Sequence, residues 1–283
     1  MGAGGWDSAT YNTVIAAGGW GNPHTMSNMS AREVYRANYL DPMLDPKGVI
    51  RECVDSEEHP QTIPIILALD VTGSMGHAAT MCAAKLDEIM TSLYSKIKDV
   101  EFMMMGIGDL AYDDAPIQAS QFESDIRIFD QTSKIYFEGG GGGNGYESYT
   151  AAWYFGLRHT KLDCWKRGKK GIIITLGDEA LNPYLPGRYL SDVLGCPSED
   201  VDTDKLYNDV IEKFDVYHIA ITDESCYSWY KEEIEKTWRP LLKQHLIIAS
   251  SDKLPEIITN IVEEHENMGT AGTVTVTEEG ISW

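Results

Sequence analysis

Apolar stretches of strand length alternate with amphipathic helical stretches along most of this chain, from residue 63 to residue 266. In the strand-like stretches the apolar residues are nearly continuous, whereas in the others they recur at every third or fourth position. The predicted strands are 63–70, 99–109, 115–122, 126–129, 133–139, 169–179, 215–222 and 244–250. The predicted helices are 77–97, 146–160, 203–214, 228–242 and 252–267.

This alternation predicts an α/β fold, a doubly wound and mainly parallel sheet with helices on both faces. The crossovers that connect its parallel strands should be right-handed. Ligands of such folds bind beyond the carboxyl ends of the strands. Polar residues that directly follow a strand are therefore the first candidates for a functional site.

The two ends of the chain differ from this central domain at 63–266. Residues 1–62 are rich in aromatic residues and glycine, with one predicted helix at 30–40 that Ser30 and Glu33 open as a capping box. We expect this extension to pack on the domain or on a partner. Residues 267–283 alternate like a strand, which would join a sheet edge or a neighbouring subunit, or remain a tail.

The charge and the cysteines narrow the setting of the protein. A net charge of −21 disfavours nucleic acid as a partner, because its phosphates would be repelled. No apolar run is long enough to span a bilayer, and the first residues do not resemble a signal peptide. The five cysteines are scattered without a CxxC pair, which favours reduced thiols. We therefore expect a cytoplasmic protein without a nucleic-acid or membrane partner.

Polar clusters follow three of the predicted strands. Because the carboxyl ends of parallel strands can meet at one crevice, we expect the three clusters to converge there. Their side chains are Asp70, Thr72 and Ser74 after the first strand, Asn144 and Glu147 after a run of five glycines, and Asp178 after the strand that begins at 169.

All of these side chains are hard oxygen donors. Such donors select Mg²⁺, Ca²⁺ or Mn²⁺, whereas Zn²⁺ prefers His and Cys. Gly73 allows a tight turn over an ion, and the amide groups of the following helix would lie close by. We therefore predict a divalent-cation site, with Mg²⁺ as the first choice and one coordination position open to an external carboxylate.

Simpler interpretations of the same residues remain open. Asp70, Thr72 and Ser74 also suit a turn that caps the following helix. The glycine run at 139–143 suits a phosphate loop, but no Gly-Lys-Ser or Gly-Lys-Thr follows it. Either Asn144 or Glu147 is the ligand of the second loop. Three further carboxylates either rim the site or form a solvated turn: Asp109, Asp113 and Asp114.

Three motifs together resemble a known family. "DVTGSM", "GGGGGNGYES" and "IIITLGDE" are similar, in this order, to the three motifs of the metal-ion-dependent adhesion site in von Willebrand factor A domains. The resemblance covers roughly residues 63–266, and it points to intracellular prokaryotic or phage members with a Rossmann-like fold. Asn144 stands where the family commonly has Thr or Asp, and Glu179 follows Asp178 where the family commonly has Gly.

The resemblance implies a function and a set of ligands. It implies a cation-dependent protein–protein interaction module, in which the metal bridges to an Asp or Glu of a protein partner. The residues that match the motifs, or could replace them, are Asp70, Thr72, Ser74, Asn144, Glu147 and Asp178.

Two alternatives to this module follow from other features. In the first, the terminal extensions build a homo-oligomer and the metal only stabilises the loops. In the second, "LALDVTGSM" resembles the nucleophile loop of haloacid dehalogenase-type phosphatases. That chemistry requires a second carboxylate where Thr72 stands, so we do not expect an enzyme.

Overall fold

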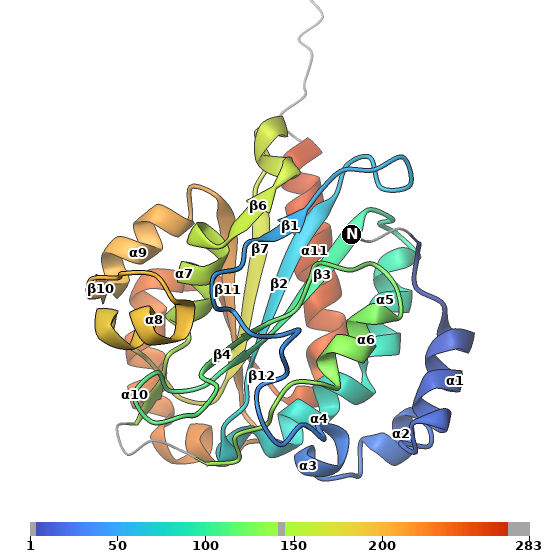
Figure 1. Ribbon diagram of the computed structural model, residues 1–283, viewed down its shortest axis with the longest axis horizontal. Coiled ribbons are helices and arrows are strands. Elements are labelled where there is room, and N and C mark those ends of the chain that lie inside the picture. The colour runs from blue at the N-terminus through green and yellow to red at the C-terminus, as the bar shows by residue number, and fades with distance from the viewer. Residues whose placement is uncertain (1–3, 141–144, 271–283) are drawn as a thin grey trace, which may run out of the picture.

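A six-stranded sheet runs through the centre of the computed structural model, which describes residues 4–140 and 145–270 (Figure 1). The strand order is β12-β11-β7-β2-β3-β4, and every neighbouring pair is parallel except β3 and β4. The strands are β2 (Ile63–Asp70), β3 (Val100–Ile107), β4 (Ile117–Ala119), β7 (Gly171–Gly177), β11 (Phe214–Ile221) and β12 (Leu246–Ala249).

Helices cover both faces of this sheet. One face packs against α4 (Gly76–Ala84), α5 (Leu86–Tyr94) and α11 (Leu254–Thr270). The other face packs against α7 (Thr150–Arg158), α8 (Gly187–Leu194), α9 (Thr203–Val210) and α10 (Ser225–Leu242). The short helix α6 (Arg127–Thr132) contacts β3.

Three further two-stranded sheets lie outside the central one, and they correct the predicted fold class. They pair β1 (Arg51–Cys53) with β6 (Thr160–Leu162), β5 (Tyr146–Glu147) with β8 (Ala180–Leu181), and β9 (Tyr184–Leu185) with β10 (Val201–Asp202). The first two pairs are parallel and the third is antiparallel. The described residues therefore form a mixed set of four separate sheets, with an antiparallel edge at β4, instead of one doubly wound sheet of the von Willebrand factor A type.

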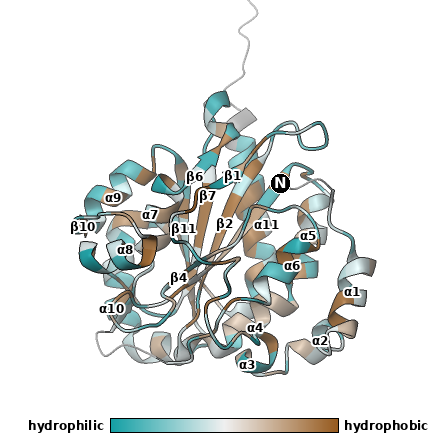
Figure 2. Cartoon of the chain, in the orientation of Figure 1, coloured by the Kyte–Doolittle hydropathy of each residue, from teal (hydrophilic) through white to brown (hydrophobic). Residues whose placement is uncertain are grey.

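The central strands form where their apolar residues can be buried on both sides. All eight residues of β2 are buried, with Ile65 and Leu67 in the cluster beneath α4, and Ile66 in the cluster beneath α7. A parallel strand covered on both faces requires a continuous apolar run rather than an alternating one. Figure 2 shows these strands as the most hydrophobic part of the interior.

Several predicted elements need correction. The stretch predicted as a strand at 126–129 lies mostly in α6, and 133–139 contains no strand. The predicted helix 77–97 is divided at Lys85 into α4 and α5. The predicted helix 30–40 shrinks to α3 (Ala31–Val34), although the Glu33 carboxylate accepts a 2.8 Å hydrogen bond from the Ser30 amide as expected of a capping box.

The N-terminal segment packs along α4 and α5 (Figure 1). It contains α1 (Ser8–Ala17), α2 (Pro23–Met26) and α3. The Tyr11 hydroxyl donates to the Ala83 carbonyl at 3.1 Å, and the Tyr35 hydroxyl donates to the Ala79 carbonyl at 2.7 Å. The Trp6 indole donates to the Asp87 carboxylate at 2.7 Å. Buried aromatic residues thus hold this segment in place, while the predicted boundaries at 62 and 267 remain predictions.

Replacing Tyr35 by Phe tests how much this packing depends on one hydrogen bond. Tyr35 is almost fully buried, and its hydroxyl has the Ala79 carbonyl as its partner. We expect Tyr35→Phe to lower the free energy of unfolding by about 1 kcal/mol, the usual net value of a buried hydrogen bond. Urea denaturation followed by circular dichroism measures it. Tyr39→Phe is the matched control, because Tyr39 is 72% exposed, and an equal loss there would contradict the interpretation.

Candidate functional site

Asp70 lies at the carboxyl end of β2 and is completely buried. One of its carboxylate oxygens accepts hydrogen bonds from the Thr72 amide at 2.9 Å and from the Thr72 hydroxyl at 2.6 Å. The other oxygen accepts from the Tyr149 hydroxyl at 2.7 Å. Burial, and then the negative charge of Asp178, raise the pKa of Asp70 well above its usual value, because both disfavour the ionised carboxylate.

Asp178 follows β7, the strand adjacent to β2 in the sheet, and is also completely buried. One oxygen accepts a hydrogen bond from the Ser74 hydroxyl at 2.8 Å, and the other accepts from the Cys226 amide at 3.0 Å. The predicted convergence of the first and third polar clusters is therefore present, and Ser74 joins them. Burial raises the pKa of Asp178, although the hydrogen bond from Ser74 opposes this rise.

Glu147 brings the second polar cluster to the same region. It belongs to β5, is 2% exposed, and has one carboxylate oxygen without a hydrogen-bond partner among the described residues. Burial, and then the charge of Asp70, raise the pKa of Glu147 strongly. Asn144, the alternative ligand, lies outside the described residues. The raised pKa favours a protonated, neutral Glu147, and an ionised Glu147 would need a positive charge beside its unsatisfied oxygen.

The glycine loop lies directly against the first cluster. The Gly73 amide donates to the Gly140 carbonyl at 2.6 Å. A Cβ atom at Gly73 would lie 3.0 Å from the carbonyl oxygens of both Gly139 and Gly140, so a larger residue would force the two loops apart. This contact accounts for the glycine between Thr72 and Ser74.

The acidic loop after β3 also reaches the site. Asp109 is 3% exposed, and its carboxylate accepts a 2.6 Å hydrogen bond from the Ala111 amide. The Ser148 hydroxyl accepts from the Leu110 amide at 3.1 Å, which joins this loop to the segment after Glu147. Asp109 thus lies in the part of the loop that contacts the site, whereas Asp113 is half-buried and Asp114 is exposed, as expected of a solvated turn.

Three residues at the site were not predicted from the sequence. Tyr149 donates to Asp70 and accepts a 3.3 Å hydrogen bond from the Glu179 amide. Glu224 follows β11 and accepts a 2.5 Å hydrogen bond from the Ala78 amide at the start of α4. Cys226 supplies the amide bound by Asp178. Applying the strand-end rule to β11 as well, which ends in "AITDES", would have identified Glu224, whereas no local pattern marks Tyr149.

The three carboxylates Asp70, Glu147 and Asp178 have no ion-pair partner in the part of the chain that the structure describes. Across 4–140 and 145–270, no group of three or more His, Cys, Asp or Glu side chains is placed to hold a metal ion. That finding counts against a centre built from such groups alone. The remaining candidate is a mixed set of two carboxylates, Asp70 and Asp178, with the hydroxyls of Thr72 and Ser74.

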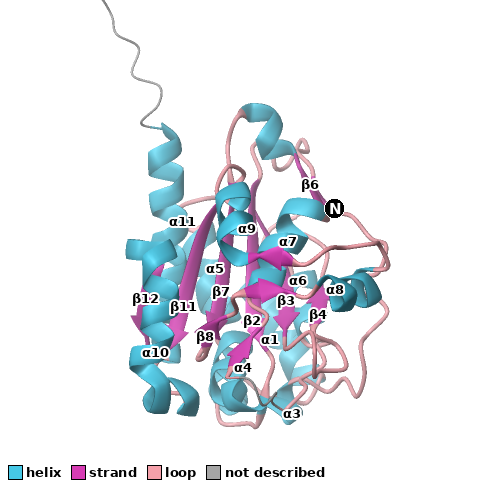
Figure 3. Ribbon diagram, turned by 90° about the vertical axis from the view of Figure 1, so that its left-hand side faces the viewer, coloured by secondary structure: helices cyan, strands magenta, loops and turns pink. Residues whose placement is uncertain are grey.

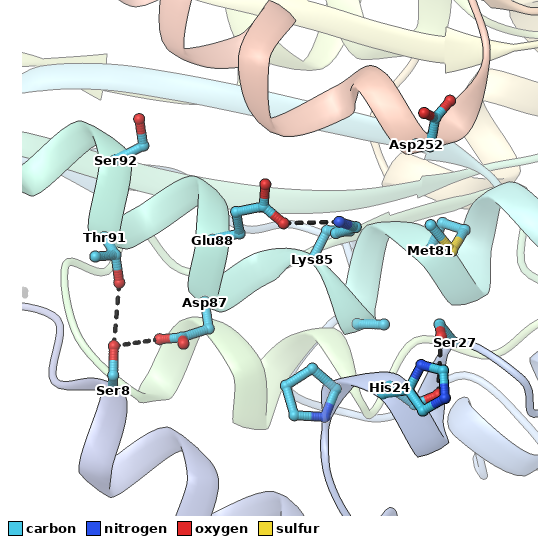
Figure 4. A pocket seen from close by; sticks show the side chains of 12 residues that line it. Ser8, His24, Ser27, Met81, Lys85, Asp87, Glu88, Thr91, Ser92 and Asp252 are labelled. Atoms are coloured by element: carbon cyan, nitrogen blue, oxygen red, sulfur yellow. Dashed lines mark hydrogen bonds and ion pairs between the residues drawn. The ribbon is translucent and has the colours of Figure 1, made fainter.

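A cavity of about 820 Å³ lies away from this cluster, between the N-terminal segment and the helices α4 and α5 (Figure 4). Three of its charged groups already have partners. The Ser8 hydroxyl donates to the Asp87 carboxylate at 2.6 Å, and the Lys85 ammonium lies 2.7 Å from the Glu88 carboxylate. The first of these contacts joins α1 to α5, and we assign the cavity no ligand.

Comparison with known proteins gives no family for this chain. No family model matches it, and no curated protein matches it. Two solved structures of the pilus adhesin SpaC from Lactobacillus rhamnosus GG are each 16% identical, with TM-scores of 0.47 and 0.46, over 77% of this chain. A mutant of the PilB minor pilin from Streptococcus sanguinis is 10% identical, with a TM-score of 0.46, over 75% of this chain. The chain spans about a third of SpaC and 63% of PilB.

These comparisons contradict several predictions from the sequence. No family model supports membership in the von Willebrand factor A family, and the structures just named are those of a pilus adhesin and a minor pilin. The metal-bridged interaction module was implied by that family resemblance, so this prediction is contradicted as well. The predicted cytoplasmic location finds no support in these comparisons either, since the solved structures named above are those of pilus proteins. Within the described residues, no helix is long and apolar enough to cross a membrane.

Proposed function

We propose that the protein is a non-enzymatic structural or assembly protein, in which a divalent cation steadies the loops at the carboxyl edge of the sheet. The observation that carries the proposal is the burial of Asp70, Glu147 and Asp178 without a lysine or arginine partner in the described chain. Buried carboxylates must either bind protons or find a positive charge. A cation would supply that charge at neutral pH.

The donors present at the cluster fit a hard cation. The Thr72 hydroxyl oxygen lies 2.6 Å from an oxygen of Asp70, and the Ser74 hydroxyl oxygen lies 2.8 Å from an oxygen of Asp178. Such oxygen donors suit Mg²⁺ first, and Ca²⁺ or Mn²⁺ as alternatives. A bound cation would supply charge compensation, and these residues would hold it. Either Glu147 or Asn144 would supply the ligand from the second loop.

The state of the neighbouring groups supports a role without catalysis. The side chain of Asp70 is completely buried, so it is inaccessible to a substrate. Burial raises the pKa of the Cys226 thiol to about 12, so the thiol is protonated at neutral pH. Burial lowers the pKa of His218 to about 3, which keeps its imidazole neutral beneath Trp238.

Thermal unfolding tests the cation. After treatment with EDTA, saturating Mg²⁺ should raise the Tm by about 5–10 °C, since a ligand at a hundred times its Kd stabilises by about 2.7 kcal/mol. Asp178→Asn should abolish the shift, because the remaining side-chain oxygen can still accept from Ser74 while one negative charge is lost. Asp209→Asn, on the exposed side of α9, is the matched control and should keep the shift. A folded wild-type protein whose Tm does not change with Mg²⁺, Ca²⁺ or Mn²⁺ would refute the proposal.

A phosphatase assay tests the absence of catalysis. With a generic aryl phosphate and Mg²⁺, we expect the wild-type protein and Asp70→Asn to release phosphate at the same background rate. Turnover that depends on both Mg²⁺ and Asp70 would instead favour the phosphatase alternative.

A further inference from the structure

Within the described part of the chain, no strand pairs with the outer edge of β12. β12 is the last strand of the central sheet, and among the described residues it pairs only with β11 (Figure 3). The Thr222 amide donates to the Ala249 carbonyl at 2.9 Å, so Ala249 points its backbone groups toward β11. Because successive residues of a strand point these groups to opposite sides, the N–H and C=O of Ile248 face the open edge.

This edge lacks the usual protection against pairing with another strand. Exposed edges are commonly blunted by charged residues, proline or a bulge. β12 has the sequence LIIA without any of these residues, and the Ile248 side chain is 38% exposed. The edge therefore offers unpaired backbone groups beside an exposed apolar side chain.

A segment of the same sequence has the composition of a matching strand. Residues 273–277 read Thr-Val-Thr-Val-Thr, and every one of them is β-branched. β-Branched residues with strict alternation are typical of strands that join a sheet. The segment has five residues, one more than the four of β12, so it is long enough to pair along the whole strand. It lies in 271–283, beyond α11 and outside the described residues.

The handedness of the connections disfavours pairing of this segment with β12 of its own chain. The helix α10 connects β11 to β12 across the face that carries α7 and α9, and this step moves outward in the sheet. The helix α11 lies on the opposite face, against α5. A parallel strand placed after α11 and outside β12 would again move outward in the sheet. Its connection, however, would cross the face opposite to the one that α10 crosses. That crossover would be left-handed, whereas about 98% of such crossovers are right-handed.

We propose that residues 271–283 of one copy of the chain add as a strand to β12 of a second copy. A strand from another copy is free of the crossover constraint, and its backbone groups would pair with those of Ile248. Reciprocal exchange would close a two-fold dimer, and one-directional exchange would build chains of copies. The inference rests on the proposed assembly role and names its partner. Because each copy carries a net charge of −21, added salt should strengthen the association by screening.

Light scattering of the purified protein tests the proposal. We expect the full chain to have at least twice the monomer mass, increasing with protein concentration and with salt. A chain that ends at Thr270 should be monomeric. Ile248→Pro should also be monomeric, because proline lacks the N–H that faces the open edge. The hydrogen bonds between β11 and β12 should remain, since the N–H of Ile248 takes no part in them. Ile248→Thr is the matched control, which keeps the N–H and a β-branched side chain and should still assemble.

Val276→Pro provides an independent test, because it changes the donated segment and leaves β12 intact; it too should give a monomer. A full chain that is monomeric at every concentration would overturn the proposal. So would assembly that persists in the chain ending at Thr270, or in a folded Ile248→Pro. Each mass is measured in EDTA and in Mg²⁺. A full chain that stays monomeric while Mg²⁺ still raises its Tm would refute only the strand exchange. A full chain that assembles while Mg²⁺ leaves its Tm unchanged would refute only the cation site.

Discussion

Replacing Trp238 by Ala should lower the free energy of unfolding by about 3–5 kcal/mol, the usual cost of truncating a fully buried tryptophan. Trp238 of α10 is completely buried, and its ring stacks on His218 with centroids 3.7 Å apart. It also packs against Tyr149 at 5.5 Å, and its indole donates to the Glu179 carbonyl at 3.0 Å. The substitution thus removes core packing and the link between α10 and the loop after Asp178.

The same helix offers a matched control. Trp229 is 73% exposed, so Trp229→Ala should change the free energy of unfolding by less than about 0.5 kcal/mol. Trp238→Phe should have an intermediate effect, because it keeps an aromatic ring and loses the hydrogen bond. Urea denaturation followed by circular dichroism measures all three variants. A loss below about 1 kcal/mol for Trp238→Ala would show that the ring is not part of the folding core.

In EDTA, the free energy of unfolding should rise by on the order of 4 kcal/mol as the pH falls from about 8 to about 5.5. Burial raises the folded-state pKa of Glu101 to about 7, and it raises those of Asp70 and Glu147 as well. A carboxyl group with a raised pKa stabilises the folded state fully below its unfolded pKa, and this contribution is lost as the pH rises through the folded pKa. His218 acts in the opposite direction, because its lowered pKa favours unfolding below about pH 6.5, but the carboxyl groups outnumber it.

Glu101→Gln isolates one of these groups away from the strand-end cluster. Glu101 lies in β3 and is 1% exposed; one of its oxygens has no hydrogen-bond partner in the described chain, and its neighbours are Cys53, His59 and Glu123. Relative to wild type, the variant should gain about 2 kcal/mol more at pH 8 than at pH 5.5. Chemical denaturation across this pH range, in EDTA, measures the difference. A wild-type stability that falls steadily toward pH 5.5 would contradict the expectation.

Local pattern was sufficient to predict the long elements and part of the site. β2, β7, β11 and α11 lie where continuous or periodic apolar residues predicted them, because burial on two faces or on one face leaves a periodic signal in the chain. The same pattern failed at 126–139, where a short apolar run suits a helix and a strand equally well and only its packing against β3 selects α6. The rule that polar residues after strands converge correctly grouped Asp70, Ser74 and Asp178.

The sequence by itself thus determined which residues form the buried strands and which polar side chains stand at their ends. Only the tertiary structure decided what those side chains contact. Tyr149 meets Asp70 from 79 positions away, and Cys226 meets Asp178 from 48 positions away. Contacts between such distant positions leave no periodic signal, because they depend on which strands become neighbours and on which face each helix packs. The open edge of β12 and the side on which α11 returns were decided in the same way.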